Sequence, residues 1–285
     1  MSRIAYVNGR YVSHREAAVH VEDRGYQFAD GVYEGIEVRG GRLVDERRHL
    51  DRLDRSLGEL SIRHPMSRQA FSVVLHETVR RNGVRDGLLY LQITRGVAPR
   101  DHAFPPDHTP PSVVVTARGS DRTRNEATAA KGIEVITVPE SRWPRVDIKS
   151  VSLLPNVLAK QAARRAGAKE AWFVDPTGHV TEGGSSNAWI VTRDGKLVTR
   201  PADFGILRGI TRTVVLDVVT AHGLTLDERP FSVEEAHAAR EAFITSATQI
   251  VMPVVRIDGR PVGNGAPGLI ACALRRDFHR HAEFS

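Results

Sequence analysis

Apolar and polar residues alternate in several short stretches of the chain, and a pair of turn-forming residues divides each of these stretches. Asn8-Gly9 divides "AYVNGRYV", Gly40-Gly41 divides "IEVRGGRLV", Asp194-Gly195 divides "IVTRDGKLV" and Asp258-Gly259 divides "VRIDGRPVG". Alternation with a period of two is typical of half-buried strands, and these residue pairs favour tight turns. The pattern therefore predicts a β-hairpin at each of these positions.

Other stretches have the apolar spacing of amphipathic helices. Leu50, Leu53, Leu57 and Leu60 recur at intervals that keep them on one helical face. Further helices are predicted from about Ser67 to Arg81, from Pro155 to Ala166 and from Thr211 to His222. Hairpins interspersed with helices indicate the α+β fold class.

The polar stretch "ARGSDRTRNEATAAKG" (117 to 132) separates two halves that are rich in predicted strands. Its composition is typical of a connection between domains, so we predict a small domain over 1–120 and a larger one over 121–285. The Pro-rich stretch "FPPDHTPP" (104 to 111) is interpreted as an exposed loop.

The charge pattern narrows the classes of function. The 40 basic and 34 acidic residues give a net charge of +6, but the two signs are interspersed, as in "DERRHLDRLDR". Nucleic-acid binders concentrate basic residues in a stripe or interleave them with stacking aromatic residues, so we expect no nucleic-acid partner. The single cysteine, Cys272, excludes an intrachain disulfide.

No stretch is apolar over the roughly 18 residues that a membrane span needs, and "MSRIAYVNGRYVSHRE" at the N-terminus lacks the apolar core of a signal peptide. The sequence therefore predicts a soluble, cytoplasmic protein without a membrane partner. His279 and His281 lie in a charged C-terminal stretch without an acidic partner segment, so we predict a solvated helix face and no metal site.

Lys149 lies within "VDIKSVSLLPNVLAK" (146 to 160), which has the pattern of a buried strand followed by a helix. In such a strand Asp147, Lys149, Val151 and Leu153 share one face. The lysine has two interpretations: it extends its ammonium group to water at the strand end, or it occupies a partly dry pocket where its amine forms a Schiff base with a carbonyl compound.

Two further stretches also have a structural and a functional interpretation. "LRGITRTVVLDVVTAHG" predicts a helix with Thr211 as its N-cap, and the N–H groups at such a helix start also bind phosphate. In "VTEGGSSNAWIV", Glu182 precedes a Gly/Ser loop and is either a solvated turn residue or a functional carboxylate. An amine, a carboxylate and a phosphate site together fit pyridoxal phosphate, which needs one of each.

Seven motifs resemble those of the fold-type-IV pyridoxal-phosphate aminotransferases, and within that family those of the D-amino acid transaminases. They cover nearly the whole chain in the family's order: "RGYQFADGVYEGIEV" (24 to 38), "HLDRL" (49 to 53), "TRGVAPRDH" (94 to 102), "KSVSLLPNVLAKQAA" (149 to 163), "TEGGSSNAW" (181 to 189), "LRGITR" (207 to 212) and "FITSAT" (243 to 248).

The resemblance implies a two-domain α+β enzyme, with a small N-terminal α/β domain and a larger C-terminal, β-barrel-like domain that has helices and binds the cofactor. It implies ping-pong transfer of an amino group between a D-amino acid, such as D-alanine or D-glutamate, and a 2-oxo acid. It also implies a homodimer with the active site at the subunit interface.

Residue by residue, the resemblance assigns Lys149 to the internal aldimine and Glu182 to the pyridine nitrogen of the cofactor. Arg52 is implied to bind the phosphate, and this assignment rests on the resemblance alone. The other implied cofactor-binding residues are Asn187, Leu207, Gly209, Ile210, Thr211, Ser246, Ala247 and Thr248.

The implied substrate-binding residues are Tyr33, Gly35, Arg100 and His102. Arg100 and His102 in "VAPRDHAFPP", with Tyr33, resemble the family's carboxylate trap, the set of side chains that binds the α-carboxylate of a D-substrate. A solvated loop is the structural alternative for Arg100.

Two positions depart from the family pattern. Gly35 stands where the better-known D-amino acid enzymes carry a branched side chain, and Ala247 stands where many relatives carry threonine. We therefore expect a different preference for substrate size and a contact made only by the backbone at Ala247. Within the fold, a branched-chain L-aminotransferase, an (R)-selective amine transaminase and an aminodeoxychorismate lyase remain as alternatives. Outside it, the alternatives are a non-enzymatic binding protein and a nucleic-acid binder that uses the basic charge.

Overall fold

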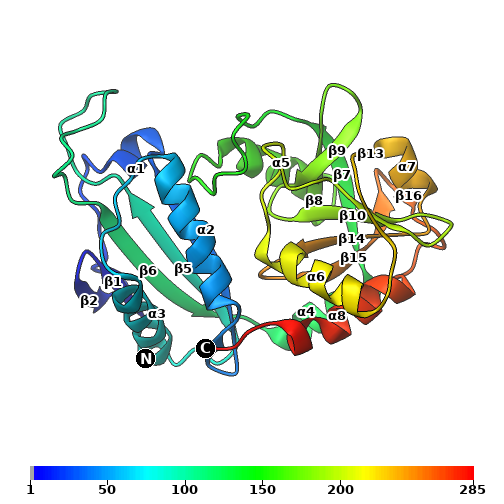
Figure 1. Cartoon of the computed structure of the whole chain (residues 1–285), viewed down its shortest axis with the longest axis horizontal. Coiled ribbons are helices and arrows are strands. Elements are labelled where there is room, and N and C mark those ends of the chain that lie inside the picture. The colour runs from blue at the N-terminus through cyan, green and yellow to red at the C-terminus, as the bar shows by residue number, and fades with distance from the viewer. Residues whose placement is uncertain (1–2) are drawn as a thin grey trace. The chain divides into compact units, whose positions relative to one another are not determined.

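The computed structural model describes residues 3–285, which form two compact units (Figure 1). Unit 1 comprises the chain through Arg122 together with 148–152 and 283–285, and unit 2 comprises 123–147 and 153–282. Two later segments of the chain therefore belong to unit 1, and the first of them carries Lys149. The domain boundary near residue 120 stays a prediction, because compactness alone does not establish that domains fold independently.

Unit 1 is built on a six-stranded antiparallel sheet in the order β2-β1-β6-β5-β3-β4. Helix α2 packs against β3, and α3 packs against β1 and β6 (Figure 1). The strands are β1 (Ile4–Val7), β2 (Arg10–Ser13), β3 (Gly31–Arg39), β4 (Arg42–Leu43), β5 (Gly87–Thr94) and β6 (Ser112–Gly119), and the helices are α1 (Arg24–Phe28), α2 (Glu46–Glu59) and α3 (Arg68–Asn82).

The leucine stripe of α2 forms part of the core of unit 1. Leu50, Leu53 and Leu57 are buried, as their spacing predicts, whereas Leu60 is the residue at which the helix ends. Helix α3 begins after Ser67, whose hydroxyl accepts a hydrogen bond from the backbone N–H of Ala70. Such a cap satisfies one of the unpaired N–H groups at a helix start, which explains why the helix begins there.

Unit 2 contains a mixed ten-stranded sheet in the order β12-β11-β10-β14-β15-β7-β8-β9-β13, with β16 paired to β15. The pairs β7–β8, β7–β15 and β11–β12 are parallel, and the others are antiparallel. The strands are β7 (Ile133–Pro139), β8 (Glu170–Val174), β9 (His179–Gly183), β10 (Asn187–Val191), β11 (Leu197–Thr199), β12 (Leu226–Glu228), β13 (Phe231–Ser232), β14 (Glu241–Ser246), β15 (Ile250–Ile257) and β16 (Arg260–Pro261). The helices are α4 (Arg122–Lys131), α5 (Leu154–Arg165), α6 (Ile210–Ala221), α7 (Val233–Ala238) and α8 (Leu269–His281).

The predicted hairpins are all present, joining β1 to β2, β3 to β4, β10 to β11 and β15 to β16. Their geometry explains the turn residues. At the first hairpin, Asn8 and Gly9 have φ angles of 46° and 92°, the left-handed conformation that Asn and Gly adopt most readily. The predicted α+β fold class is confirmed.

The stretch 117–132 differs from the irregular connection that its polar composition suggests. Strand β6 continues to Gly119, and α4 occupies Arg122–Lys131. Its alanines and long polar side chains have good helix propensity, which explains why a polar stretch forms a helix here.

Two predictions about local structure around the candidate site are wrong. The N-cap of α6 is Gly209, not Thr211, which lies in the first helical turn. The stretch 146–153 is not a regular strand: the N–H of Ser150 donates to the carbonyl of Ile148 at 2.8 Å, so the chain turns there. An isolated bridge between Ser150 and Val32 joins the stretch to β3.

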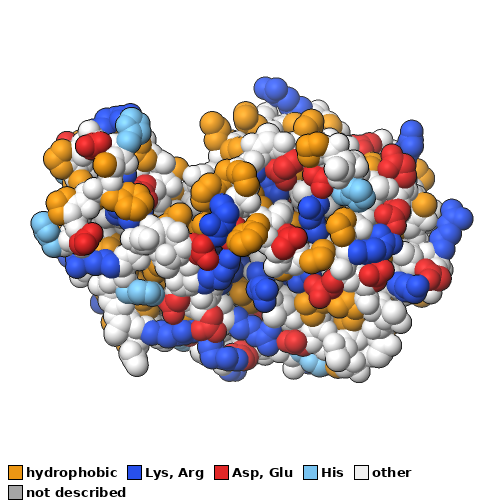
Figure 2. Space-filling view, turned by 45° about the horizontal axis from the view of Figure 1, so that its top comes forward, with side chains coloured by type: hydrophobic (Ala, Val, Ile, Leu, Met, Phe, Trp, Pro, Cys, Tyr) orange, Lys and Arg blue, Asp and Glu red, His pale blue; other side chains and the backbone are white. Residues whose placement is uncertain are grey.

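Several surface features agree with the sequence. No helix among residues 3–285 is both long enough and apolar enough to cross a membrane. Lys and Arg side chains are interspersed with Asp and Glu side chains on the face shown in Figure 2. The Pro-rich stretch has no regular structure, and Phe104 within it is 64% exposed, so the predicted exposed loop is confirmed.

Candidate active site

Lys149 is fixed through its backbone on two sides within unit 1. Its carbonyl accepts a hydrogen bond from the N–H of Tyr33 on β3 (3.0 Å), and its own N–H donates to Ser56 Oγ on α2 (3.3 Å). The neighbouring Ile148 is buried in the hydrophobic core of unit 1. The side chain is half-buried and lies over the Tyr33 ring, with Nζ 4.2 Å from the ring centroid. The amine is thus held at a defined position.

Strand β3 presents different residues on its two faces. Val32, Ile36 and Val38 are buried in the core, whereas Tyr33 and Gly35 alternate with them and point to the other face. On that face the Tyr33 ring stacks on Tyr90 at 5.7 Å. Burial raises the pKa of Tyr90 to about 12, and the nearby Tyr33 adds to the effect.

The glycine at position 35 leaves room on this second face of β3. A Cβ atom there would meet only the Leu88 side chain within 4 Å, at an ordinary contact distance of 3.5 Å. A side chain is therefore sterically allowed at this position, and its absence is a property of this sequence rather than a requirement of the backbone.

Arg52 on α2 is oriented by a buried carboxylate. Its Nε and Nη2 donate to the two oxygens of Glu34 at 2.8 and 2.7 Å, and His49 Nδ1 lies 2.7 Å from Glu34 Oε2. Burial alone would raise the pKa of Glu34, but the charge of Arg52 and the hydrogen bonds from Arg52 and His49 hold this pKa at about 2. Burial lowers the pKa of His49, so we assign a neutral imidazole that donates its Nδ1–H to Glu34.

Glu34 and His49 were not predicted as members of the site, although one signal was available. Glu34 alternates with Val32 and Ile36 and so falls on the core face of β3, where a carboxylate needs a partner. Arg52 and His49 lie one helical turn apart on α2, at a spacing that lets both reach the same group.

Glu182 is buried in β9, so its interpretation as a solvated turn residue is wrong. Its Oε2 accepts hydrogen bonds from Asn187 Nδ2 (2.9 Å) and from the backbone N–H of Leu207 (3.2 Å). Asn187 Nδ2 also donates to the Leu207 carbonyl at 2.9 Å. The structure thus brings three of the predicted cofactor-binding residues into direct contact within unit 2.

Arg142 is a partner of Glu182 that no pattern in the sequence indicated. Its Nη1 donates to Glu182 Oε1, its Nη2 donates to Glu140 Oε2 at 2.6 Å, and its guanidinium lies 4.4 Å from the centroid of the Phe173 ring. Burial would lower the pKa of Arg142. The hydrogen bonds and charges of Glu140 and Glu182 outweigh this effect and raise the pKa. Two carboxylates around one guanidinium carry one net negative charge, which suits a cationic ring nitrogen.

The start of α6 has the features of an anion site. Its N-cap is Gly209, which has no side chain that could cap the first turn, and this turn contains Ile210 and Thr211. A Cβ atom at Gly209 would lie 2.1 Å from Asn187 Oδ1, so only glycine allows this close approach. The N–H groups and dipole at the start of such a helix favour a phosphate.

The turn at 246–248 lies next to Asn187 in the sheet of unit 2. Ser246 ends β14, and the preceding Thr245 is paired with Asn187 on β10. The carbonyl of Thr248 accepts a hydrogen bond from Asn125 Nδ2 at 3.1 Å. Ala247 offers only its backbone polar groups, and the backbone contact expected there stays a prediction.

Arg100 and His102 lie on an exposed loop of unit 1 and share one aromatic neighbour. The Arg100 guanidinium lies 4.7 Å from the centroid of the Phe28 ring, and the His102 ring centroid lies 5.3 Å from that of Phe28. Tyr33, the third residue of the predicted carboxylate trap, contacts Tyr90 and Lys149. The structure therefore brings Arg100 and His102 together but describes no contact of either with Tyr33.

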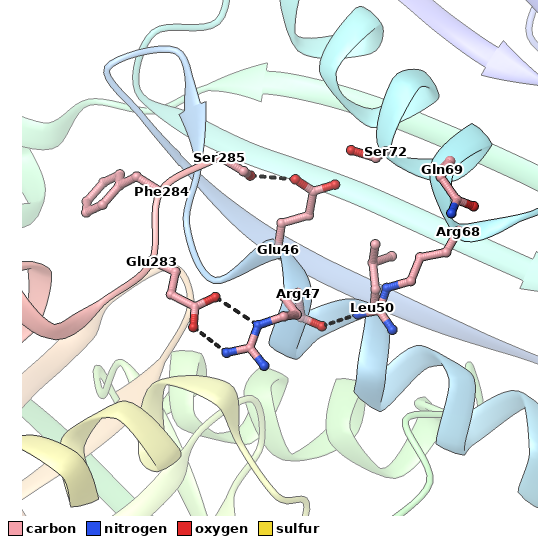
Figure 3. Close-up of a pocket in the computed structure, with 9 residues that line it drawn as sticks. All are labelled: Glu46, Arg47, Leu50, Arg68, Gln69, Ser72, Glu283, Phe284 and Ser285. Atoms are coloured by element: carbon pink, nitrogen blue, oxygen red, sulfur yellow. Dashed lines mark hydrogen bonds and ion pairs between the residues drawn. The ribbon is translucent and has the colours of Figure 1, made fainter.

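A separate pocket of about 370 Å³ in unit 1 contains none of the predicted site residues. Figure 3 shows that its wall includes the C-terminal segment 283–285 beside the start of α2. Ser285 exchanges two backbone hydrogen bonds with Leu43 (3.0 and 3.1 Å), and Glu283 accepts hydrogen bonds from Arg47. This segment thus anchors the end of the chain beside the helix that carries Arg52.

Known proteins place the chain in a family. The model of amino-transferase class IV matches residues 31–257. The D-alanine aminotransferase of Bacillus licheniformis is 44% identical over 261 residues, which are 92% of this chain and 90% of that protein. The D-alanine aminotransferase of Staphylococcus haemolyticus is 38% identical over 279 residues, or 98% of this chain and 97% of that protein. This chain belongs to the class IV aminotransferases.

A solved structure is similar over almost the whole fold. The branched-chain aminotransferase of the archaeon Thermoproteus uzoniensis, solved with norvaline, matches with a TM-score of 0.87 and 28% identity, covering 98% of this chain and 94% of that chain. The family resemblance predicted from the motifs is therefore confirmed, both in sequence and in fold.

Proposed function

We propose that this protein is a pyridoxal-phosphate-dependent transaminase that moves an amino group between a D-amino acid, such as D-alanine or D-glutamate, and a 2-oxo acid. The observation that carries the chemistry is the position of Lys149, whose amine is held over Tyr33 by a backbone that is fixed on both sides. The D-alanine aminotransferases among its relatives support the choice of substrate.

The residues of the site fit the cofactor in the chemistry of their donor groups. The cluster of Glu140, Arg142 and Glu182 has the net negative charge that a protonated pyridine nitrogen needs, and Asn187 and Leu207 hold Glu182 in place. When bound, pyridoxal phosphate supplies the electron sink for breaking a bond at the substrate Cα.

The phosphate group is assigned to a second set of residues. In unit 1, Arg52 would hold it with a guanidinium that Glu34 and His49 orient. In unit 2, the N–H groups of Ile210 and Thr211 are the proposed phosphate ligands. Gly209 allows the start of α6 to approach Asn187, and the turn of Ser246, Ala247 and Thr248 completes the set.

Lys149 has two tasks in this account. Its amine would hold pyridoxal phosphate covalently, and the freed amine would serve as the base that takes up the proton from the substrate Cα. The Tyr33 ring lies beside the amine and attracts the ammonium group that forms once the amine has taken up the proton, because a cation is attracted to a ring face.

The α-carboxylate of the substrate binds to Arg100, His102 and Tyr33, and its side chain lies toward Gly35. An arginine can bind a carboxylate with two parallel hydrogen bonds, which fixes orientation as well as position. Pinning the carboxylate at this set rather than at the 246–248 turn presents the Cα–H of the D-enantiomer to Lys149.

The active site lies at the interface of a homodimer, with Arg100 acting on the partner subunit's site. Mixing inactive Lys149→Ala subunits with weakened Arg100→Ala subunits should then give more activity than Arg100→Ala alone, because one hybrid site inherits both intact groups. No recovery despite demonstrated subunit exchange would show that Arg100 serves its own subunit. The cytoplasmic location stays a prediction from the sequence.

A branched-chain L-amino acid aminotransferase is the second candidate. The similarity to the Thermoproteus uzoniensis branched-chain enzyme favours it, since that match covers 98% of this chain. The lower identity of that enzyme, 28% against 44% for the Bacillus licheniformis D-alanine aminotransferase, makes it the weaker candidate.

Reconstitution and steady-state kinetics test the proposed reaction. Adding pyridoxal phosphate to the cofactor-free protein should produce a visible absorption band. Initial rates with D-alanine and a 2-oxo acid should give the parallel double-reciprocal lines of a ping-pong mechanism. A protein that stays colourless after reconstitution would rule out this class of enzyme.

A further inference from the structure

Helix α1 holds the backbone of the loop that carries Arg100 and His102. Arg24 of α1 is buried, and its Nη1 and Nη2 donate to the carbonyls of Asp101 and His102 at 2.6 and 3.4 Å. A planar guanidinium bonded to two consecutive carbonyls restrains both the position and the direction of that backbone. The loop is therefore exposed, but hydrogen bonds from Arg24 fix its backbone at Asp101 and His102.

The same helix supports the side chains of the loop through one aromatic ring. Phe28, at the end of α1, contacts the guanidinium of Arg24 at 4.8 Å and that of Arg100 at 4.7 Å from its centroid. The His102 ring lies 5.3 Å away from it in a tilted arrangement. One half-buried ring thus contacts both Arg100 and His102.

Helix α1 is itself fixed to unit 1. Asp23 accepts hydrogen bonds from the N–H of Gly25 and from Thr94 Oγ1 on β5, both at 2.9 Å. A Cβ atom at Gly25 would lie 2.2 Å from Thr94 Cγ2, so the helix packs against β5 as closely as only glycine permits. Asp30 then ties Arg24 and Arg95 together through contacts at 2.8 Å to each.

We propose that Arg24 and Phe28 are positioning residues for the substrate carboxylate: Arg24 fixes the loop backbone, and Phe28 holds the side chains of Arg100 and His102 in the arrangement that binds it. The inference rests on the proposed function, in which Arg100 and His102 bind that carboxylate. Exposed arginine side chains have many rotamers, and a ring that restricts them reduces the conformational entropy lost on binding.

Kinetics of Phe28 variants test the role of the ring. Phe28→Ala should raise KM for D-alanine about tenfold and leave kcat within about twofold, because the ring acts before the chemical step. Phe28→Tyr keeps the aromatic face and should restore KM. Phe284→Ala, which removes a ring beneath Arg42 elsewhere in unit 1 (5.2 Å), is the matched control and should leave KM unchanged.

A double-mutant cycle separates positioning from a structural role. In the Arg100→Ala/His102→Ala background, Phe28→Ala should have no further effect on KM, because the groups that it positions are gone. A full effect of Phe28→Ala in that background would overturn the inference. If Arg100→Ala and His102→Ala alone leave the KM for D-alanine unchanged, the proposed function itself fails.

Hydrogen exchange on the cofactor-free protein tests the role of Arg24 without any activity. Arg24→Lys keeps the charge beside Asp30, but its single ammonium group cannot replace the planar fork to two carbonyls. Backbone amides at 100–103 should therefore exchange several-fold faster in this variant, while those of β5 stay protected. Unchanged exchange at 100–103 in a folded Arg24→Lys protein would contradict the proposed tether.

Discussion

The Nζ atom of Lys149 lies 4.2 Å from the centroid of the Tyr33 ring, and the Lys149 carbonyl accepts the Tyr33 N–H at 3.0 Å. Lys149 is assigned to the cofactor and Tyr33 to the substrate. The residues with these two roles therefore contact each other through both the backbone and the side chains. Ser56 on α2 fixes Lys149 from a second direction. The position of the amine therefore depends on β3 and α2, both within unit 1.

Replacing Lys149 by alanine should abolish the visible absorption band of the reconstituted protein. The fold should persist, because the backbone contacts of this segment do not involve the side chain. Absorption spectra and the melting temperature check both expectations. Lys160→Ala is the control, since Lys160 is bound to the Lys169 carbonyl and Glu170, and this variant should keep the band. Turnover near the wild-type rate in Lys149→Ala would assign the chemistry to another lysine.

Glu182→Gln should keep the visible band but lower kcat by about tenfold or more, because a neutral amide does not favour the protonated pyridine nitrogen. The neutral amide also weakens the interaction with Arg142, so that within this cluster Glu140 becomes the carboxylate that compensates the charge of Arg142. Stopped-flow absorbance of the half-reaction measures the effect directly. An unchanged rate constant would assign Glu182 a purely structural role.

Glu34→Gln should destabilise the protein by about 3–5 kcal/mol at neutral pH, because it removes the buried negative charge that faces the Arg52 guanidinium. The folded-state pKa of Glu34 is lowered to about 2, so its contribution is fully present above the ordinary glutamate pKa of about 4.5 and is lost as the pH falls toward 2. Denaturant unfolding from pH 7 to pH 3 should show the two proteins converging as the pH falls.

Glu77 offers a matched comparison for Glu34. Its pKa is also held at about 2, by hydrogen bonds from Arg80 and Arg81, but these partners are largely exposed on α3. Solvent screens such pairs, so Glu77→Gln should change stability far less than Glu34→Gln. Equal effects of the two substitutions would show that burial of Glu34 is not the source of its contribution.

Gly35→Val should narrow the range of D-substrates. The structure has room for a side chain at this position, with only Leu88 nearby, so the fold should tolerate the change. We expect catalytic efficiency with D-leucine to fall at least tenfold while that with D-alanine changes about threefold or less. Equal losses for both substrates would place the substrate side chain away from Gly35.

The sequence predicted elements whose causes are local. The leucine stripe of α2, the Ser67 cap of α3 and the turn pair Asn8-Gly9 each depend on residues a few positions apart. The stretch around Lys149 was predicted incorrectly as a strand, because its turn at Ile148–Ser150 depends on docking against β3 and α2. Tertiary contacts of this kind leave no periodic signal.

The residues of the candidate site also divide into those that the sequence indicates and those that only the three-dimensional structure reveals. Lys149, Glu182 and the start of α6 carry chemistry that their residue types suggest, and Arg52 was found by family resemblance. Arg142 was missed, because it lies 40 residues from Glu182 in an irregular connection and no local pattern marks it. Charge neutralisation between distant segments becomes visible only in three dimensions.

The half-reaction with both enantiomers of alanine and of leucine tests the D-amino acid assignment most directly. D- and L-alanine, and D- and L-leucine, are mixed separately with the reconstituted enzyme, and bleaching of the visible band is followed. We predict faster bleaching by the D-forms, and in Arg100→Ala a roughly ten- to hundredfold lower efficiency with D-alanine while the band itself is retained. Faster bleaching by the L-forms would contradict the D-amino acid assignment and favour the branched-chain class.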